Sequence, residues 1–307
     1  MTAIVIIGCA AVAAYFTGCN NTSTGRLYSE KRVAMGTFVE VISPESKALY
    51  IAFDEIRRIE KLLSKYDQNS EISQLNRHGR LKASPETFYI VKRAKEFYSL
   101  TNGAFDITVG PLMDLWGFTE KKYSVPSERK IKSALKLIGS DKIILHEKDS
   151  VIQFKLSGMK IDLGAIAKGY AVDCAVKKLK EAGIKSCLIN AGGQVDCLGS
   201  RFSKPWKVAL KNPRGLGVTD YLELKNKAVS TSGNYEQSFK DCRKDYGHIF
   251  DPKTGSPKET DILSVTVIAF DSLTADALST AIFALGKEKG ELLISKLTGI
   301  EVKIIEK

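Results

Sequence analysis

The 307-residue sequence lacks the patterns that mark several common classes of binding protein. No run of Lys and Arg reaches five residues, so the net charge of +11 is spread over a solvated surface, and no nucleic-acid partner is expected. The cysteines form no C-x-x-C pair and have no histidine at metal-ligand spacing, which argues against a zinc site. A Walker A loop and the G-x-G-x-x-G fingerprint of dinucleotide-binding folds are also absent.

Charge is missing from the first eighteen residues, where Ile4 to Phe16 form a continuous apolar run. The run is too short and too rich in small residues for a typical membrane-spanning helix, and it ends in Phe16-Thr17-Gly18-Cys19. This pattern resembles a bacterial lipoprotein signal over residues 1–18, with Cys19 as the lipid-modified first residue of the mature chain. We therefore expect an exported, membrane-anchored lipoprotein on the periplasmic face or cell surface, with residues 19–27 as a tether. Because a basic start is missing, an uncleaved N-terminal anchor is the alternative.

The pattern of apolar residues predicts an α+β fold for residues 28–307, which no linker divides. Long helical periods alternate with short strands and with turns that contain Gly or Asn, and this mixture argues against a doubly wound sheet. Helices are predicted at 43–66, 85–102, 126–139, 167–182, 273–285 and 288–297. Strands are predicted at 38–42, 142–146, 151–155, 159–163, 186–190, 194–198, 206–210, 221–225, 263–269 and 300–305.

Asp276 and Thr280 are four residues apart on the predicted helix 273–285, so their side chains share one face of that helix. A carboxylate and a hydroxyl are hard oxygen ligands, which suit Mg²⁺ or Ca²⁺ when other oxygens complete the shell. The alternative is structural: the helix dipole favours an acidic residue at the position of Asp276, and Thr280 occupies a neutral helix position. The spacing alone leaves both interpretations open.

A second candidate segment runs from Asp162 to Tyr170, where a predicted strand passes through a glycine turn into a helix. Such a junction exposes backbone amides and carbonyls, and Lys168 in the first helical turn could meet a phosphate. An ordinary turn with a surface lysine is the alternative. His248 is one of three histidines and lies in a polar, aromatic turn, where either a structural or a catalytic role is possible.

Further polar and aromatic motifs are spread along the chain. The N-terminal half carries Met35-Gly36-Thr37, Ser64-Lys65-Tyr66-Asp67 and Gly103-Ala104-Phe105-Asp106. The C-terminal half carries Asp162 to Tyr170, Asn190-Ala191-Gly192-Gly193, Ser230 to Glu236, His248-Ile249-Phe250-Asp251-Pro252 and Thr274 to Thr280. In their order along the chain, these segments resemble the motifs of the ApbE-like FAD:protein FMN transferases. The chain departs from the family at Phe250, where an aliphatic residue is common, and over Phe202 to Asp220, which is less recognisable.

The resemblance implies a two-part α+β structure of the ApbE, T-fold-like type, with a flavin cleft between the parts. It implies that Mg²⁺ binds the backbone carbonyl of Ala165 and the side chains of Asp276 and Thr280. Tyr66 is the expected platform for a flavin or adenine ring. The full set of implied FAD contacts is Met35, Tyr66, Ala104, Phe105, Asp106, Asp162, Lys168 and Phe250.

The implied reaction places the FMN half of FAD on a Thr or Ser hydroxyl of a target protein and releases AMP. Mg²⁺ and Lys168 are expected to offset charge on the pyrophosphate. His248 is the first candidate for the base that assists the acceptor hydroxyl, and Asp106 is the second. The expected acceptors are flavoproteins of membrane electron-transport complexes. The alternatives are an FAD pyrophosphatase, which gives FMN and AMP, and a non-catalytic periplasmic FAD-binding lipoprotein.

Overall fold

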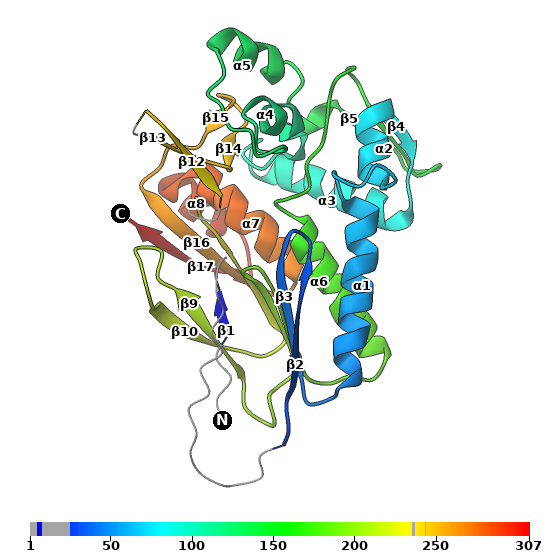
Figure 1. The fold of residues 1–307 in the computed structure, drawn as a ribbon, viewed down its shortest axis with the longest axis vertical. Helices are drawn as coiled ribbons and strands as arrows, with labels where there is room; N and C mark the ends of the chain where they lie inside the picture. The colour runs from blue at the N-terminus through cyan, green and yellow to red at the C-terminus, as the bar shows by residue number, and fades with distance from the viewer. Residues whose placement is uncertain (1–4, 8–24, 235–236, 243) are drawn as a thin grey trace.

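The computed structural model describes residues 5–7 and 25–307, except 235–236 and 243. Its centre is a seven-stranded sheet in which neighbouring strands are antiparallel (Figure 1). The hairpin at one edge turns through Met35 and Gly36, whose φ angles of 54° and 71° are those of a tight left-handed turn. The strand order is β17 (Glu301–Glu306), β16 (Ile262–Ala269), β11 (Lys227–Ser232), β8 (Gln194–Leu198), β7 (Cys187–Ala191), β3 (Thr37–Ser43) and β2 (Tyr28–Ala34).

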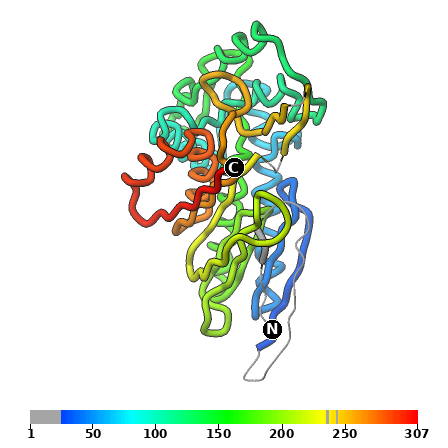
Figure 2. The backbone as a smooth tube through the Cα atoms, turned by 90° about the vertical axis from the view of Figure 1, so that its left-hand side faces the viewer, coloured from blue at the N-terminus to red at the C-terminus, as the bar shows by residue number. Residues whose placement is uncertain are grey.

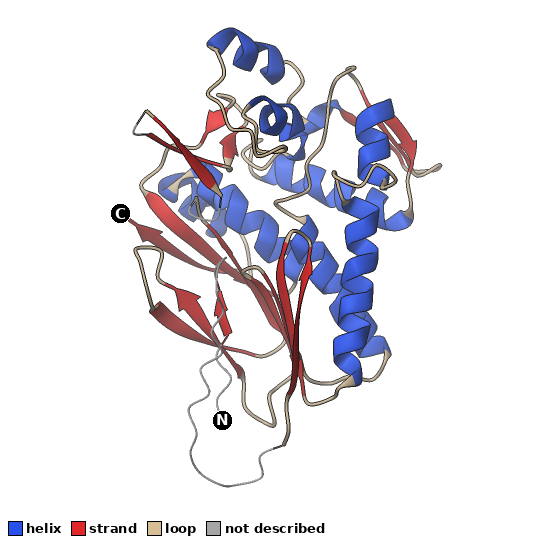
Figure 3. Ribbon diagram, in the orientation of Figure 1, coloured by secondary structure: helices blue, strands red, loops and turns tan. Residues whose placement is uncertain are grey.

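Three long helices pack on one face of this sheet: α1 (Lys47–Leu63), α6 (Ala167–Glu181) and α7 (Ser272–Leu285) (Figure 3). Helix α1 buries the apolar stripe that the sequence predicts, including Phe53, Ile56 and Ile59. Helix α7 is apolar on nearly every side, because it lies between α6 and strands β11 and β16. Its position places the polar side chains of Ser272, Asp276 and Ser279 in the protein interior.

The opposite face of the sheet is covered by β9 (Trp206–Lys211) and β10 (Val218–Leu224). The buried indole of Trp206 packs there against apolar side chains of the central strands. Strand β1 (Val5–Ile7) pairs with β9 in parallel.

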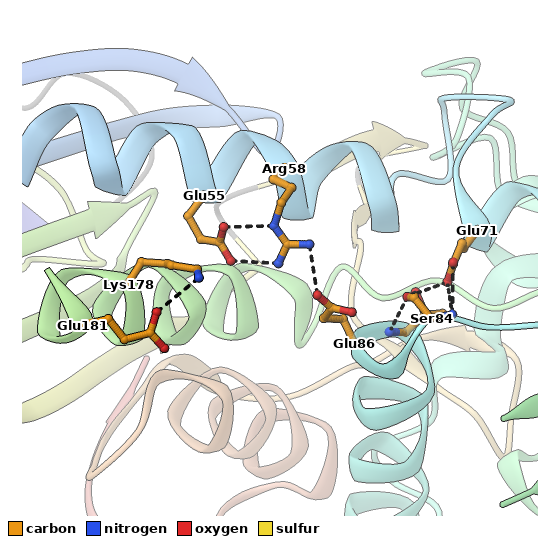
Figure 4. A network of polar contacts seen from close by, with 8 residues as sticks. Glu55, Arg58, Glu71, Ser84, Glu86, Lys178 and Glu181 are labelled. Atoms are coloured by element: carbon orange, nitrogen blue, oxygen red, sulfur yellow. Dashed lines mark hydrogen bonds and ion pairs between the residues drawn. The ribbon is translucent and has the colours of Figure 1, made fainter. Parts of the chain in front are cut away.

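A second part of the molecule lies at one end of the three helices, as the turned view in Figure 2 shows. Arg58 of α1 connects the two parts by binding Glu55 at 2.8 Å and Glu86 of α3 at 3.0 Å (Figure 4). The helices of this part are α2 (Glu71–His78), α3 (Pro85–Leu100), α4 (Gly110–Leu115) and α5 (Glu128–Leu135), with short 3-10 turns η1 (Ile107–Val109) and η2 (Ser140–Lys142). Its strands are β4 (Arg80–Lys82), β5 (Ile143–His146), β6 (Val151–Phe154), β12 (Ser238–Asp241), β13 (Lys244–Gly247), β14 (Phe250–Asp251) and β15 (Ser256–Pro257), and α8 (Lys287–Ile294) follows α7.

The observed elements confirm the predicted α+β class and most predicted helices and strands within a few residues. The strand predicted at 159–163 is wrong, because this segment runs as a loop whose Asp162 N–H donates to the Ile107 carbonyl at 2.7 Å. Strand β11 in the centre of the sheet was not predicted, because Ser230 and Ser232 give this buried strand the sequence pattern of a polar turn.

The predicted signal over 1–18, Cys19 and most of the tether lie outside the described residues, so these remain predictions, as do the domain limits. Within the described ranges, we find no helix that combines the length and apolar character needed to cross a bilayer.

Candidate functional site

Asp276 lies in the second turn of α7, and 2% of its surface is exposed. Its Oδ2 accepts a hydrogen bond from the Gly169 N–H of α6 at 2.9 Å. Its Oδ1 lies 3.6 Å from Nζ of Lys168, which also donates to the Gly164 carbonyl at 3.1 Å. These contacts of Asp276 and Lys168 therefore hold helix α7 against the turn between Asp162 and α6.

The three oxygen ligands implied for a metal ion fit this junction. In a regular helix the Gly169 N–H would donate to the Ala165 carbonyl four residues earlier, but here it donates to Asp276. Among the described residues, no other donor is found for the Ala165 carbonyl. A backbone carbonyl, a carboxylate and the Thr280 hydroxyl are a donor set suited to Mg²⁺. The described part of the chain holds no cluster of three or more His, Cys, Asp or Glu side chains. The predicted triad is a different kind of site, because only one of its three ligands is a carboxylate.

Helices α6 and α7 cap one another at this crossing. Asp276 of α7 accepts from α6, while Asp173 of α6 accepts from the backbone N–H groups of Ser272 and Leu273, at 2.7 and 2.9 Å. The helices approach closely at Gly169, where an added Cβ would lie 2.3 Å from the Ser272 carbonyl oxygen. The reciprocal caps therefore fix Asp276 relative to the Ala165 turn.

Two carboxyl groups beneath the start of α7 have perturbed acidity. Desolvation raises the pKa of Asp173 to about 7, although the hydrogen bonds from Leu273 and Ser272 oppose the shift. Desolvation, with a smaller effect of the Asp173 charge, raises the pKa of Asp196 to about 7 as well. Asp196 accepts from the Ser272 hydroxyl at 3.1 Å. The start of α7 is therefore sensitive to pH near neutrality.

On the other side of the turn, Asp162 pairs with Lys65 at 2.6 Å, and both side chains are largely buried. Burial alone would lower the pKa of Lys65, but the charge and hydrogen bond of Asp162 outweigh it and raise the pKa. The other oxygen of Asp162 accepts from the Gly164 N–H at 2.8 Å, which fixes the turn. Lys65 Nζ also lies 5.1 Å from the centre of the Tyr66 ring, which is 67% exposed and so open to a ligand ring.

His248 is half-exposed, and its ring Nδ1 lies 3.1 Å from the Gln237 carbonyl oxygen. Because a carbonyl can only accept, Nδ1 carries the proton and Nε2 keeps its lone pair. Desolvation by the protein atoms around the ring lowers the pKa of His248 to about 4. The Lys168 charge lowers this pKa further, while the Gln237 hydrogen bond and the Asp162 charge oppose the shift. The imidazole is thus neutral at pH 7 with a basic nitrogen available.

Asp106 lies in a separate environment, at a cavity of about 300 Å³ lined by parts of 98–106, 138–139 and 252–253. Its Oδ1 accepts from the Thr108 N–H at 2.8 Å and from the Thr108 and Ser140 hydroxyls at 2.7 Å. Desolvation raises the pKa of Asp106, although these hydrogen bonds act against the shift. Asp106 therefore caps η1 and holds the cavity wall together.

Comparison with known proteins decides the family. The ApbE family model matches residues 35–304. This chain belongs to the ApbE family. The FAD:protein FMN transferases of Klebsiella pneumoniae and Vibrio cholerae are 33% and 31% identical to it, over 93% and 86% of this chain and 91% and 80% of theirs.

Solved structures of the ApbE family share the fold. The ApbE protein of Thermotoga maritima is 36% identical with a TM-score of 0.86, and the match covers 92% of this chain and 94% of that one. The flavinyl transferase ApbE of Pseudomonas stutzeri in its apo form is 29% identical with a TM-score of 0.82, covering 92% of each chain. The predicted family, fold class and enzymatic character are confirmed by these matches.

The remaining ApbE-like positions differ in how they could meet a ligand. Phe105 and Phe250 are 2% and 5% exposed, so their side chains belong to the core, and a contact with FAD would use their backbone. Met35 lies at the β2–β3 turn, where its N–H donates to Glu60 at 2.6 Å, and Ala104 is partly buried. Asp162, Lys168, His248 and Asp276 are brought together, whereas Asp106 lies apart at the cavity.

Four polar residues of this region had no role predicted from the sequence. Lys65 precedes Tyr66 in a motif that the sequence made visible, but its ion pair with Asp162 was not predicted. Asp173 interrupts the apolar face of α6, a position at which a carboxylate needs a donor from a neighbouring element. Ser232 and Ser279 surround Thr280, and only the pairing of β11 with α7 reveals their contact.

Proposed function

We propose that this chain catalyses Mg²⁺-dependent transfer of the FMN half of FAD to a Thr or Ser hydroxyl of a target protein, with release of AMP. The observation that supports the proposal is the hydrogen bond from the Gly169 N–H to Asp276, which holds this carboxylate 3.6 Å from Lys168 and next to the turn that contains Ala165. The names of the ApbE relatives support the overall activity.

The chemistry divides among a few groups. Mg²⁺ at the Ala165, Asp276 and Thr280 oxygens would neutralise charge on the FAD pyrophosphate. Lys168, whose ammonium group lies 3.6 Å from Asp276, binds an anionic phosphate oxygen next to this position. The exposed Tyr66 ring stacks on a flavin or adenine ring, and the Lys65–Asp162 pair holds the wall behind it.

His248 is the base in this proposal. The acceptor oxygen attacks the phosphorus of the FMN phosphoryl group, its proton passes to Nε2, and the bond from that phosphorus to the bridging oxygen breaks as AMP leaves. The Gln237 carbonyl supports this role, since it holds the proton on Nδ1. Asp106 is less suited, because its Oδ1 already accepts three hydrogen bonds.

We also propose that the chain acts outside the cytoplasm, anchored through lipid on Cys19, on flavoproteins of membrane electron-transport complexes. The apolar run before Cys19 supports the anchor. Labelling with a palmitate analogue tests it, because a Cys19→Ala variant should lose the label and leave the membrane fraction.

Mass spectrometry after incubation with FAD, Mg²⁺ and an acceptor flavoprotein tests the activity. We expect the acceptor to gain one FMN while AMP appears. Free FMN and AMP with an unchanged acceptor would favour the pyrophosphatase, and intact FAD would favour a storage protein. A His248→Gln variant should bind FAD normally and transfer FMN slowly, and unchanged turnover would remove His248 from the mechanism.

A further inference from the structure

A chain of buried hydroxyl groups lies behind Thr280, between helix α7 and strand β11. Ser232 Oγ of β11 lies 3.2 Å from Thr280 Oγ1 and 2.8 Å from Ser279 Oγ. Ser279 is fully buried, and its hydroxyl reaches the Asp276 backbone carbonyl at 3.0 Å. The chain thus starts at one implied metal ligand and ends on the backbone of another.

The last acceptor in the chain sets the direction of the hydroxyl protons. The carbonyl of Asp276 can only accept, so Ser279 donates its single proton to it. Ser279 then accepts from Ser232, and Ser232, having used its proton, accepts from Thr280. Ser279 also lies 3.3 Å from Ser230 Oγ, to which its hydroxyl can donate instead, and this alternative likewise turns the Ser279 proton away from Ser232. All the hydroxyls are satisfied in this arrangement, as buried polar groups require.

We propose that Ser232 and Ser279 are positioning residues that point the Thr280 hydroxyl proton away from the site, so that its oxygen lone pairs face a divalent cation. A hydroxyl binds a cation only through its lone pairs, and a proton turned toward the cation would repel it. The hydroxyl chain fixes this orientation before the cation arrives, as outer-shell hydrogen bonds do at other metal sites. This inference rests on the proposed function, since it takes Thr280 as a metal ligand.

The chain makes a specific prediction about combined substitutions. In Ser232→Ala the Thr280 hydroxyl loses its acceptor and is free to turn toward the site. In Ser279→Ala the Ser232 proton turns back to Thr280 and occupies one of its lone pairs. Because the two serines act in series, the double variant should bind a cation no more weakly than Ser232→Ala alone.

The experiment measures binding of Mn²⁺ by electron paramagnetic resonance in the presence of FAD and without an acceptor. We expect each alanine variant to raise the dissociation constant of Mn²⁺ about tenfold and to leave FAD binding unchanged. Ser232→Thr keeps the hydroxyl and should bind Mn²⁺ like the unaltered protein. Thr266→Val is the matched control. It removes one hydroxyl of the Thr231–Thr266 pair, whose oxygens lie 2.8 Å apart on the neighbouring strands β11 and β16. This pair lies on the face of β11 opposite to Ser232.

Two results would overturn the inference. If Ser232→Ala binds Mn²⁺ within twofold of the unaltered protein, the hydroxyl chain does not orient Thr280. If the losses in the two single variants multiply in the double variant, the serines act independently. If the unaltered protein itself binds no Mn²⁺ with FAD, the proposed metal site fails, and that outcome is distinguishable because it precedes any substitution.

Discussion

The cap that Asp173 places on helix α7 is open to a direct stability test. Truncation to alanine removes the acceptor for the Ser272 and Leu273 N–H groups, which it now binds at 2.7 and 2.9 Å. Both residues are buried, with 0% and 2% of their surfaces exposed. The perturbation therefore leaves two donors at the start of a buried helix without a partner.

The size of the effect follows from the two donors. Each buried donor left unsatisfied costs about 1–3 kcal/mol, which gives a gross loss of about 2–6 kcal/mol. Relief of the unfavourable burial of the carboxyl group offsets part of this loss, and Asp173 is only partly buried, so water can reach the two donors. We therefore expect a net loss of about 2–3 kcal/mol, equivalent to a fall in the melting temperature of about 5 °C for a chain of this size.

Denaturant unfolding followed by circular dichroism measures this free energy. Asp271→Ala is the matched control. Asp271 caps the same helix by accepting from the Thr274 N–H at 2.8 Å, but it is exposed and does not join α7 to α6. Asp173→Ala should be clearly the less stable of the two. Equal stability of the two variants would refute the idea that reciprocal capping holds the helices together.

Further predictions concern the same crossing and the base. Gly169→Ala should destabilise the protein and weaken Mn²⁺ binding, because its Cβ would lie 2.3 Å from the Ser272 carbonyl oxygen; calorimetry and metal titration check this. The raised pKa of Asp196, about 7, means that the folded protein holds this proton more tightly than the unfolded chain, so stability should fall as pH rises from about 4 to 7. Asp196→Asn should flatten that slope in pH-dependent unfolding. The pKa of His248, about 4, predicts a rate profile without the usual histidine inflection near pH 6.5, and an inflection there that His248→Gln removes would contradict it.

Much of the fold was predictable because helical and strand periods are local properties of the sequence. The start of α3 follows from Ser84-Pro85, and the apolar stripe of α1 follows from its spacing. The face shared by Asp276 and Thr280 was predicted in the same way, from a helix that the structure places at Ser272–Leu285.

Other features depend on contacts between distant segments and have no local signal. Strand β11 is polar in sequence because its serines face α7, not solvent. The pairing of Lys65 with Asp162 joins residues 97 positions apart, which no periodicity reveals. The sequence also could not show that the Phe105 ring lies in the core, so that only the backbone of this residue could contact a ligand.

The most direct test of the account replaces one oxygen ligand of the proposed site. Asp276→Asn keeps an acceptor for the Gly169 N–H but removes the charge that the metal requires. With FAD, Mg²⁺ and an acceptor flavoprotein, we expect its initial rate of FMN transfer, read as acceptor mass, to fall at least about a hundredfold. Ser84→Ala, which removes a helix cap in α3, should transfer at the normal rate. Full transfer by Asp276→Asn at ordinary Mg²⁺ concentrations would contradict the account.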